Sequence, residues 1–151
     1  AWCMTGWRCG WLVHPASLGD RMGDLSGINN TGATSFVQHA AATAIRDGEE
    51  FVTEMVERCR RGRDLVHQRL GGMDRIKLAS PKAAFYAFPQ IEGLKDDLEF
   101  AKYLVREHRV GLAPGSAFGP DNDGFLRLCF AKSEEQLSAA MDRIEAGLKN
   151  L

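Results

Sequence analysis

The stretch GFLRLCFA, residues 124–131, is followed two residues later by SEEQ, residues 133–136. The first is predicted to be a strand, because apolar and aromatic residues fill it from Phe125 onward. The second is typical of a capping box, in which Ser133 and Gln136 satisfy backbone N–H groups at the start of a helix. A strand that passes directly into a capped helix indicates a sheet covered by helices.

Working outward from this stretch, the preceding segments show the same alternation of strands and helices. Short apolar runs predict strands over residues 76–79, 84–88 and 110–113. A capped helix is expected from Asp96 to about His108, and a long amphipathic helix from Glu49 to Leu70. The acidic and basic residues at 57–64 are interpreted as the solvated side of that long helix. The predicted fold class is therefore α/β, an α+β sandwich with a small sheet covered by helices on one face.

The N-terminal elements have a different pattern. Residues Trp7–Val13 are aromatic and β-branched enough for a strand. A helix is expected after Pro15, and residues 27–32 are predicted to form a loop. A second helix is expected from Thr34 to Asp47, ended by Gly48.

This order of elements predicts a division of the chain. Residues 1–48 are interpreted as the tail of one domain, residues 49–72 as a linking helix, and residues 73–151 as a small C-terminal domain. The opening residues contain no initiator Met and resemble a loop that enters a strand. We therefore expect an internal cut at this end, with further chain before Ala1.

Composition excludes several classes of function. A net charge of -1 provides no basic field for nucleic acid or an anionic membrane surface. No apolar stretch reaches the roughly 20 residues of a membrane-spanning helix, and no secretory signal is visible. The histidines are scattered without metal-ligand spacing, so no metal is expected. The cysteines are interpreted as reduced thiols of a cytoplasmic protein, Cys3, Cys9, Cys59 and Cys129.

Two arginines are the strongest candidates for binding chemistry. Arg127 lies in an otherwise apolar strand, and a buried guanidinium without a partner is costly. It should therefore face an anion, either an Asp or Glu of its own domain or a ligand carboxylate. Arg8 lies among small and aromatic residues at a predicted strand entrance, where its planar fork could hold a phosphate or carboxylate. The alternative for Arg8 is a surface packing or cation–π pair with a neighbouring Trp.

Four ordered blocks, which span nearly the whole chain, resemble one family. They read MTGWRCGW, PKAAFYAFP, APGSAFG and GFLRLCFA, at residues 4–11, 81–89, 113–119 and 124–131. They are similar to the M-T-G-W-R-x-G-[YW], P-x-G-A-F-Y-x-F-P, P-G-[ST]-x-F-G and G-x-x-R-[LI]-[SC]-[FY]-A segments of class I pyridoxal-phosphate (PLP) dependent aminotransferases of fold type I, of the aspartate aminotransferase type.

The resemblance implies a fragment holding the family's C-terminal small domain and the tail of its large, PLP-binding domain. Arg8 matches the arginine that pairs with the cofactor phosphate, and Arg127 the one that binds the substrate α-carboxylate. The Schiff-base lysine would lie immediately before Ala1, so no catalytic residue is expected within the chain and the fragment alone should be inactive. Ala83 stands where the family has Gly, which predicts local strain if that position needs a positive φ.

The implied activity is transfer of an amino group between an amino acid, aspartate among the candidates, and a 2-oxo acid. Family members are usually homodimers. A PLP-dependent lyase of the same fold, an effector-binding aminotransferase-like domain of a transcription regulator, and a structural remnant without activity remain as alternatives. The hypothesis requires Arg8 and Arg127 to face a shared anion-binding pocket, and it would fail if carboxylates of their own domain neutralised both.

Overall fold

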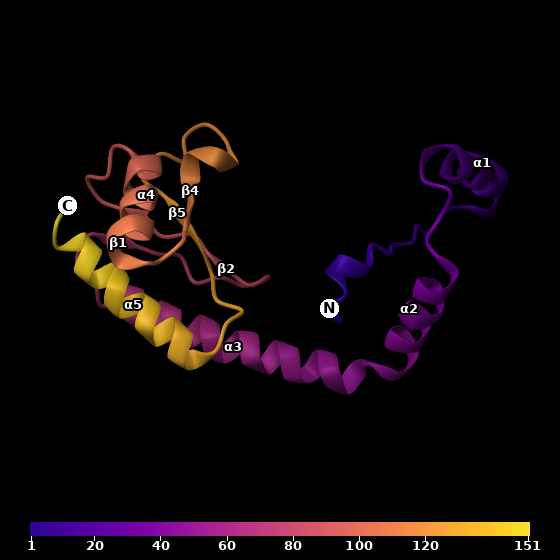
Figure 1. Cartoon of the computed structure of the whole chain (residues 1–151), viewed down its shortest axis with the longest axis horizontal. Coiled ribbons are helices and arrows are strands. Elements are labelled where there is room, and N and C mark those ends of the chain that lie inside the picture. Colours follow the sequence, from indigo (N-terminus) through magenta and orange to yellow (C-terminus); the bar gives the residue numbers. More distant parts are fainter. The chain divides into compact units, whose positions relative to one another are not determined.

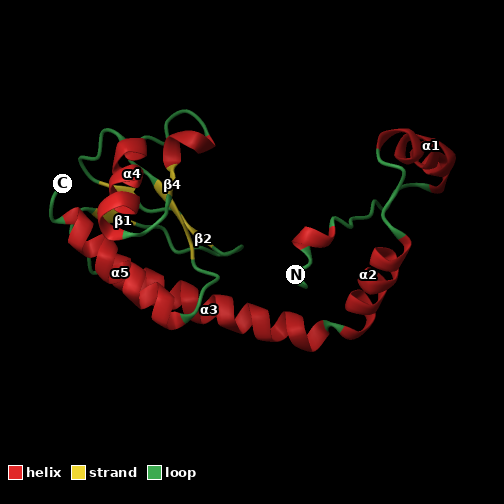
Figure 2. Cartoon of the chain, viewed as in Figure 1, coloured by secondary structure: helices red, strands yellow, loops and turns green.

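The computed structural model describes all 151 residues, and the chain divides into two compact units, Ala1–Met55 and Val56–Leu151. Helices predominate in both units, and the strands belong to the second (Figures 1 and 2). No helix has the length and apolar character needed to cross a membrane. The His, Cys, Asp and Glu side chains form no group of three or more that could hold a metal ion.

The first unit consists of helices and connecting loops. Its elements are η1 (Thr5–Trp7), η2 (Ala16–Leu18), α1 (Gly19–Asn29), α2 (Ser35–Asp47) and the first turns of α3 (Glu49–Gly71). Val37 is its one buried hydrophobic residue. The Trp2 ring lies against Gly48, where an added Cβ would come within 2.7 Å of that ring.

Two predictions for this unit are wrong and two are confirmed, the first of them the helix after Pro15, which is present as η2 and α1. The segment Trp7–Val13 forms no strand: it contains the end of η1 and then irregular backbone, because a strand requires a hydrogen-bonded partner and none pairs with it. The loop predicted over residues 27–32 is shorter, since α1 continues through Gly27 to Asn29. The second helix is confirmed, and Gly48 is its C-cap residue.

The second unit contains two small antiparallel sheets. In one, β1 (Ile76–Lys77) pairs with β3 (Gln90–Ile91). In the other, β5 (Leu126–Cys129) is the central strand between β2 (Tyr86–Ala87) and β4 (Ala113–Pro114). The runs predicted around residues 76–79 and 84–88 are therefore both strands, but they belong to different sheets. The run predicted at 110–113 becomes a strand only at Ala113, and β3 was not predicted.

Helices cover one face of the three-stranded sheet. Leu126 and Leu128 of β5 are buried in a core that also contains residues of α3, α4 (Asp97–His108) and α5 (Glu134–Leu148). The helical members of this core are Val66, Leu70, Phe100, Ala101, Leu104, Leu137, Met141, Ile144 and Leu148. The second unit is therefore a mixed α/β structure, with helices packed on small antiparallel sheets, as its strand and helix pattern indicates.

Local helix signals are confirmed. The Asp96 side chain accepts a hydrogen bond from the Glu99 N–H at the start of α4, and Ser133 with Gln136 forms the capping box of α5. The long helix α3 covers the predicted range, and three arginines of the 57–64 stretch, Arg60, Arg61 and Arg63, form salt bridges with acids at the surface. At Gly62 the helix is buried against the Phe130 carbonyl, which leaves no room for a Cβ. This close approach explains a glycine in the interior of α3.

Candidate functional site

Arg127 lies on the open face of the three-stranded sheet. Successive residues of β5 point to opposite faces, and Leu126 and Leu128 are buried under the helices. Arg127 therefore points the other way, and it is half-buried. Its neighbours across the sheet are Ala113 of β4, directly opposite, and Tyr86 of β2, which is opposite Cys129.

The guanidinium of Arg127 lies between two aromatic rings. Its Cζ is 4.4 Å from the centroid of the Tyr86 ring and 4.2 Å from that of the Phe118 ring. No Asp or Glu oxygen lies within 4.0 Å of its nitrogens, and its side chain makes no hydrogen bond to the protein. Of the two anions that the sequence left open, the carboxylate of its own domain is thus not the partner. The N–H donors of Arg127 remain available to a ligand.

The loop that carries Phe118 is fixed by a buried carboxylate. Asp97, at the start of α4, is 4% exposed and accepts hydrogen bonds from the Ser116 N–H at 2.7 Å and the Ser116 hydroxyl at 2.8 Å. The loop forms the short helix η3 (Gly115–Phe118), whose Gly115 N–H donates to the Phe125 carbonyl at 2.8 Å. These bonds tie the loop to α4 and to Phe125, the residue directly before the strand that carries Arg127.

Arg8 has a different environment in the first unit. It is exposed, and its Nη1 donates to the Thr5 carbonyl at 3.2 Å. No carboxylate pairs with it. Its backbone has φ 54° and ψ 42°, a left-handed conformation that costs a non-glycine residue about 1–2 kcal/mol. Such strain concentrates at ligand-binding sites, so the backbone is compatible with a binding role.

Neither Arg8 nor Arg127 is neutralised by a carboxylate. The structure therefore does not contradict the hypothesis that both bind anions of a ligand or cofactor. Arg8 belongs to the first unit and Arg127 to the second. Their binding roles and their approach to a shared pocket stay predictions, as does the division at residues 48 and 72.

The strained alanine is not the one that the sequence predicts. Ala83, which replaces the family glycine, has no positive φ, whereas its neighbour Ala84 has φ 60°. Both are exposed. The left-handed turn thus falls one residue later, directly before the segment that leads into β2.

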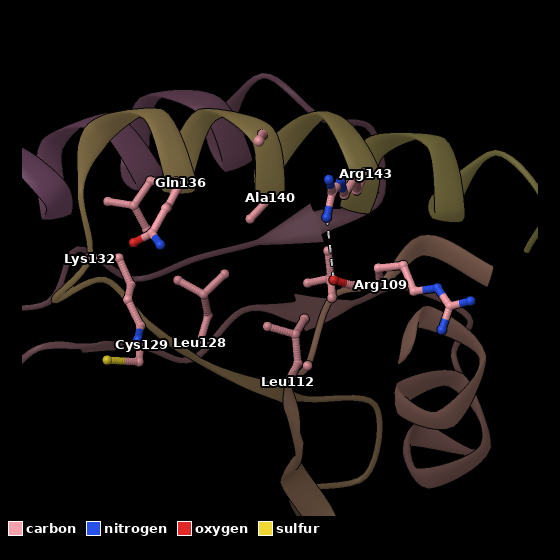
Figure 3. A pocket seen from close by; sticks show the side chains of 12 residues that line it. Arg109, Leu112, Leu128, Cys129, Lys132, Gln136, Ala140 and Arg143 are labelled. Atoms are coloured by element: carbon pink, nitrogen blue, oxygen red, sulfur yellow. Dashed lines mark hydrogen bonds between the residues drawn. The ribbon is translucent and has the colours of Figure 1, made fainter. Parts of the chain in front are cut away.

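A separate basic groove lies between α5 and the end of β5 (Figure 3). It has a volume of about 390 Å³, and Arg109, Lys132 and Arg143 provide its charged side chains. The Arg143 Nη1 donates to the Arg109 carbonyl at 3.4 Å, and apolar residues such as Leu112 and Leu128 contribute to its lining. Arg127 is not among the lining residues, so this groove is not the predicted carboxylate site.

Sequence reasoning missed the residues around Arg127. Tyr86, Phe118 and Asp97 were quoted only within strand, loop and helix patterns. The spacing of two residues within β5 indicates which face Arg127 occupies, but its ring neighbours depend on the register of β2 and the path of the loop. One signal was available: Phe118 lies in a Gly-rich loop otherwise made of small residues, where a large ring needs a partner.

The comparisons with known proteins agree on one family. The model of "Aminotransferase class I and II" matches residues 1–144. The chain belongs to the class I and II aminotransferase family. Members of this family depend on PLP. The resemblance seen in the sequence blocks is thereby confirmed.

Two curated relatives of this chain come from Thermococcus and Pyrococcus. It is 41% identical over 150 residues to aromatic-amino-acid aminotransferase 2 of Thermococcus litoralis, an alignment that covers 97% of this chain and 38% of the relative. It is 39% identical to an aspartate aminotransferase of Pyrococcus abyssi, with the same coverage. The chain thus spans less than two fifths of the length of these relatives.

Solved aminotransferase structures have the same fold as this chain. An aromatic aminotransferase from Pyrococcus horikoshii superposes with a TM-score of 0.88 at 38% identity, covering 97% of this chain and 40% of that one. An aspartate aminotransferase from Rhizobium meliloti superposes with a TM-score of 0.86 at 32% identity, covering 97% and 39%. The chain therefore has the fold of a part of fold type I aminotransferases, about two fifths of their length.

Proposed function

We propose that this chain is the C-terminal portion of a PLP-dependent aminotransferase, called here the parent enzyme, which transfers an amino group between an amino acid and a 2-oxo acid. In this proposal residues 73–151 are the small domain, residues 49–72 the linking helix and residues 1–48 the tail of the large domain. The names of the relatives support aspartate or an aromatic amino acid as the donor. The observation that carries the proposal is the half-buried guanidinium of Arg127, which lacks any carboxylate of its own chain.

The role proposed for Arg127 is to bind the substrate α-carboxylate. Its N–H groups form a planar fork that matches two carboxylate oxygens, and such charge-assisted bonds contribute about 1.5–3 kcal/mol. Two parallel bonds also restrict rotation of the substrate about the axis through its carboxylate. Arg127 thus orients the Cα–H bond that must be cleaved without itself taking part in proton transfer.

The role proposed for Arg8 is to hold the PLP phosphate. The residue fits that group: its side chain is exposed, carries no salt bridge and makes one hydrogen bond, to the Thr5 carbonyl. A free guanidinium can donate to several phosphate oxygens at once. When bound, PLP would supply the electron sink for chemistry at the substrate Cα. Arg8 would keep the phosphate end in place.

The parent enzyme tests the proposal directly. A panel of amino acid and 2-oxo acid pairs should show transamination, with kcat/KM highest for an acidic or aromatic donor. Arg127→Gln removes the fork and should lower kcat/KM by about 10- to 150-fold, since 1.4 kcal/mol corresponds to a factor of ten. Arg127→Lys keeps the charge without the fork and should recover only part of this loss.

Two comparisons accompany the panel. Lys132→Gln removes a positive charge from the basic groove, away from the proposed site, and should leave kcat/KM within about two-fold, as expected for a surface charge. The 151-residue chain alone should not transaminate, because the family lysine has no match among its residues.

We expect the parent enzyme to be a homodimer, which light scattering would show. Unchanged kcat/KM in Arg127→Gln would contradict the role of Arg127.

A further inference from the structure

The two rings around Arg127 have a role beyond packing. We propose that Tyr86 and Phe118 are positioning residues that fix the plane of the Arg127 guanidinium and leave its in-plane N–H edge as the open approach for a carboxylate. This inference deepens the proposed function and rests on it, because it takes Arg127 as the carboxylate-binding group. It adds Tyr86 and Phe118 to the residues that determine how the ligand is held.

The geometry of a guanidinium explains why its faces matter. All five N–H donors lie in one plane, so a hydrogen-bonded ligand must approach in that plane. Cations attract the faces of aromatic rings, and Cζ of Arg127 lies within 4.4 Å of both ring centroids. Tyr86 packs against Phe85, and Phe118 packs against Phe88, rather than against each other. The guanidinium therefore lies between two separate aromatic groups.

The position of each ring is set independently of the other. Tyr86 is opposite Cys129 in the β2–β5 pairing, two residue positions along β5 from Arg127, which places it on the same face as Arg127 as a diagonal neighbour. Phe118 ends η3, the short helix that the buried carboxylate of Asp97 anchors through Ser116. The Phe88 ring adds an edge-to-face contact to Phe118 at 6.1 Å. Arg127 is thus held by a strand on one side and an anchored loop on the other.

The two rings lie outside the hydrophobic core and remain partly exposed. Tyr86 is 37% exposed and Phe118 is 43% exposed, and neither belongs to the hydrophobic core of the second unit. Large apolar side chains in such positions gain only part of the free energy that full burial would give. The two rings cover the guanidinium of Arg127, and these are its two cation–π contacts. The arrangement fits a ligand-binding group that is oriented before the ligand arrives.

The test observes the Arg127 side chain in the 151-residue chain by nuclear magnetic resonance. The Arg127→Lys variant assigns the Nε–H signal by its loss. Two flanking rings should shift this signal away from those of the other arginines, through their ring currents. Tyr86→Leu and Phe118→Leu should each move it back toward the common position. Tyr86→Phe, which keeps the ring and removes the hydroxyl, is the matched control and should leave the shift unchanged.

Succinate, a simple dicarboxylate, is the binding probe in the same experiment. It should perturb the Arg127 signal, and its dissociation constant should rise about two- to five-fold when either ring is removed, as expected for a partly exposed cation–π contact. Tyr86→Phe should restore the affinity of the unsubstituted chain. Because the two leucine variants change different elements, each tests the proposal if the other fails to fold.

The outcomes separate this inference from the function on which it rests. An Arg127 signal without a ring-current shift overturns the positioning role, even if succinate still perturbs that signal and supports Arg127 as the carboxylate group. A shifted signal that succinate does not perturb overturns the carboxylate role of Arg127, and with it the inference that the rings orient this group for a carboxylate. In the parent enzyme, loss of a ring should raise KM for the amino acid more than it changes kcat. A larger change in kcat than in KM would contradict positioning of the bound carboxylate.

Discussion

At the residue scale, the sequence identified charges more readily than their surroundings. Arg127 stands out because a guanidinium in an apolar strand needs an anion, and the structure excludes a carboxylate partner from its own chain. Its ring neighbours could not be predicted, because they come from segments 41 residues before and 9 residues before it, through a register that sequence alone does not determine. The charge is a local property, whereas its contacts are not.

The positive φ at Ala84, where the sequence predicted strain at Ala83, leads to a prediction for both residues. Ala84→Gly should stabilise the chain by about 0.5–1 kcal/mol, because it relieves a left-handed conformation at the cost of a more flexible unfolded chain. Ala83→Gly is the matched control at the adjacent exposed position. It has no positive φ to relieve and should destabilise by about 0.4–1 kcal/mol. Urea unfolding of the 151-residue variants measures both changes in stability. If Ala83→Gly stabilised the chain and Ala84→Gly destabilised it, the strained residue would be Ala83.

At the element scale, the sequence predicted helices more accurately than strands, although β1, β2 and β5 all lie within predicted strand runs. The ends of α2, α4 and α5 depend on nearby residues, namely Gly48, Asp96, and Ser133 with Gln136, so a local pattern suffices. The segment Trp7–Val13 has a strand composition but no partner, and it remains irregular. Conversely, β3 exists because it pairs with β1, a contact that its two residues do not encode alone. Strand formation depends on distant pairing, which explains this asymmetry.

The crossing of α3 and the segment after β5 depends on one glycine. Gly62→Ala should destabilise the chain by about 1–2 kcal/mol, because a Cβ there meets the Phe130 backbone, and that overlap outweighs the roughly 1 kcal/mol gained in helix propensity. Gly71→Ala, at the end of the same helix, meets nothing within 4 Å and should be neutral or stabilising. Urea unfolding midpoints distinguish the two. Equal effects would mean that the helix and Phe130 can separate at little cost.

At the scale of the whole molecule, the two units differ in how much they bury. The second unit contains 15 of the 16 buried hydrophobic residues, while Val37 is the one in the first unit. Large apolar residues of the first unit remain exposed, Trp11, Leu12, Val13, Ile28 and Phe36. The sequence anticipated a change in organisation near the long helix, but it could not show how unequal the two cores are.

This inequality predicts a difference in protection from hydrogen exchange. In the 151-residue chain, amides of α1 and α2 should exchange faster than those of α4 and α5, because opening a helix with few buried contacts requires less free energy. Mass spectrometry of peptides from residues 16–47 and 97–148 gives the comparison within one sample. Similar protection in both sets would show that the first unit is stabilised by something other than buried apolar surface.

The rings beside Arg127 also affect the thermodynamics of binding. A free arginine side chain carries about 2 kcal/mol of rotamer entropy, which a ligand must otherwise remove when it orders the guanidinium. Here the side chain is already confined between Tyr86 and Phe118 before any ligand is present. Calorimetry of carboxylate binding should therefore show a smaller entropic penalty in the unsubstituted protein than in Phe118→Leu. Part of the cost of ordering the ligand complex is thus met when the protein folds.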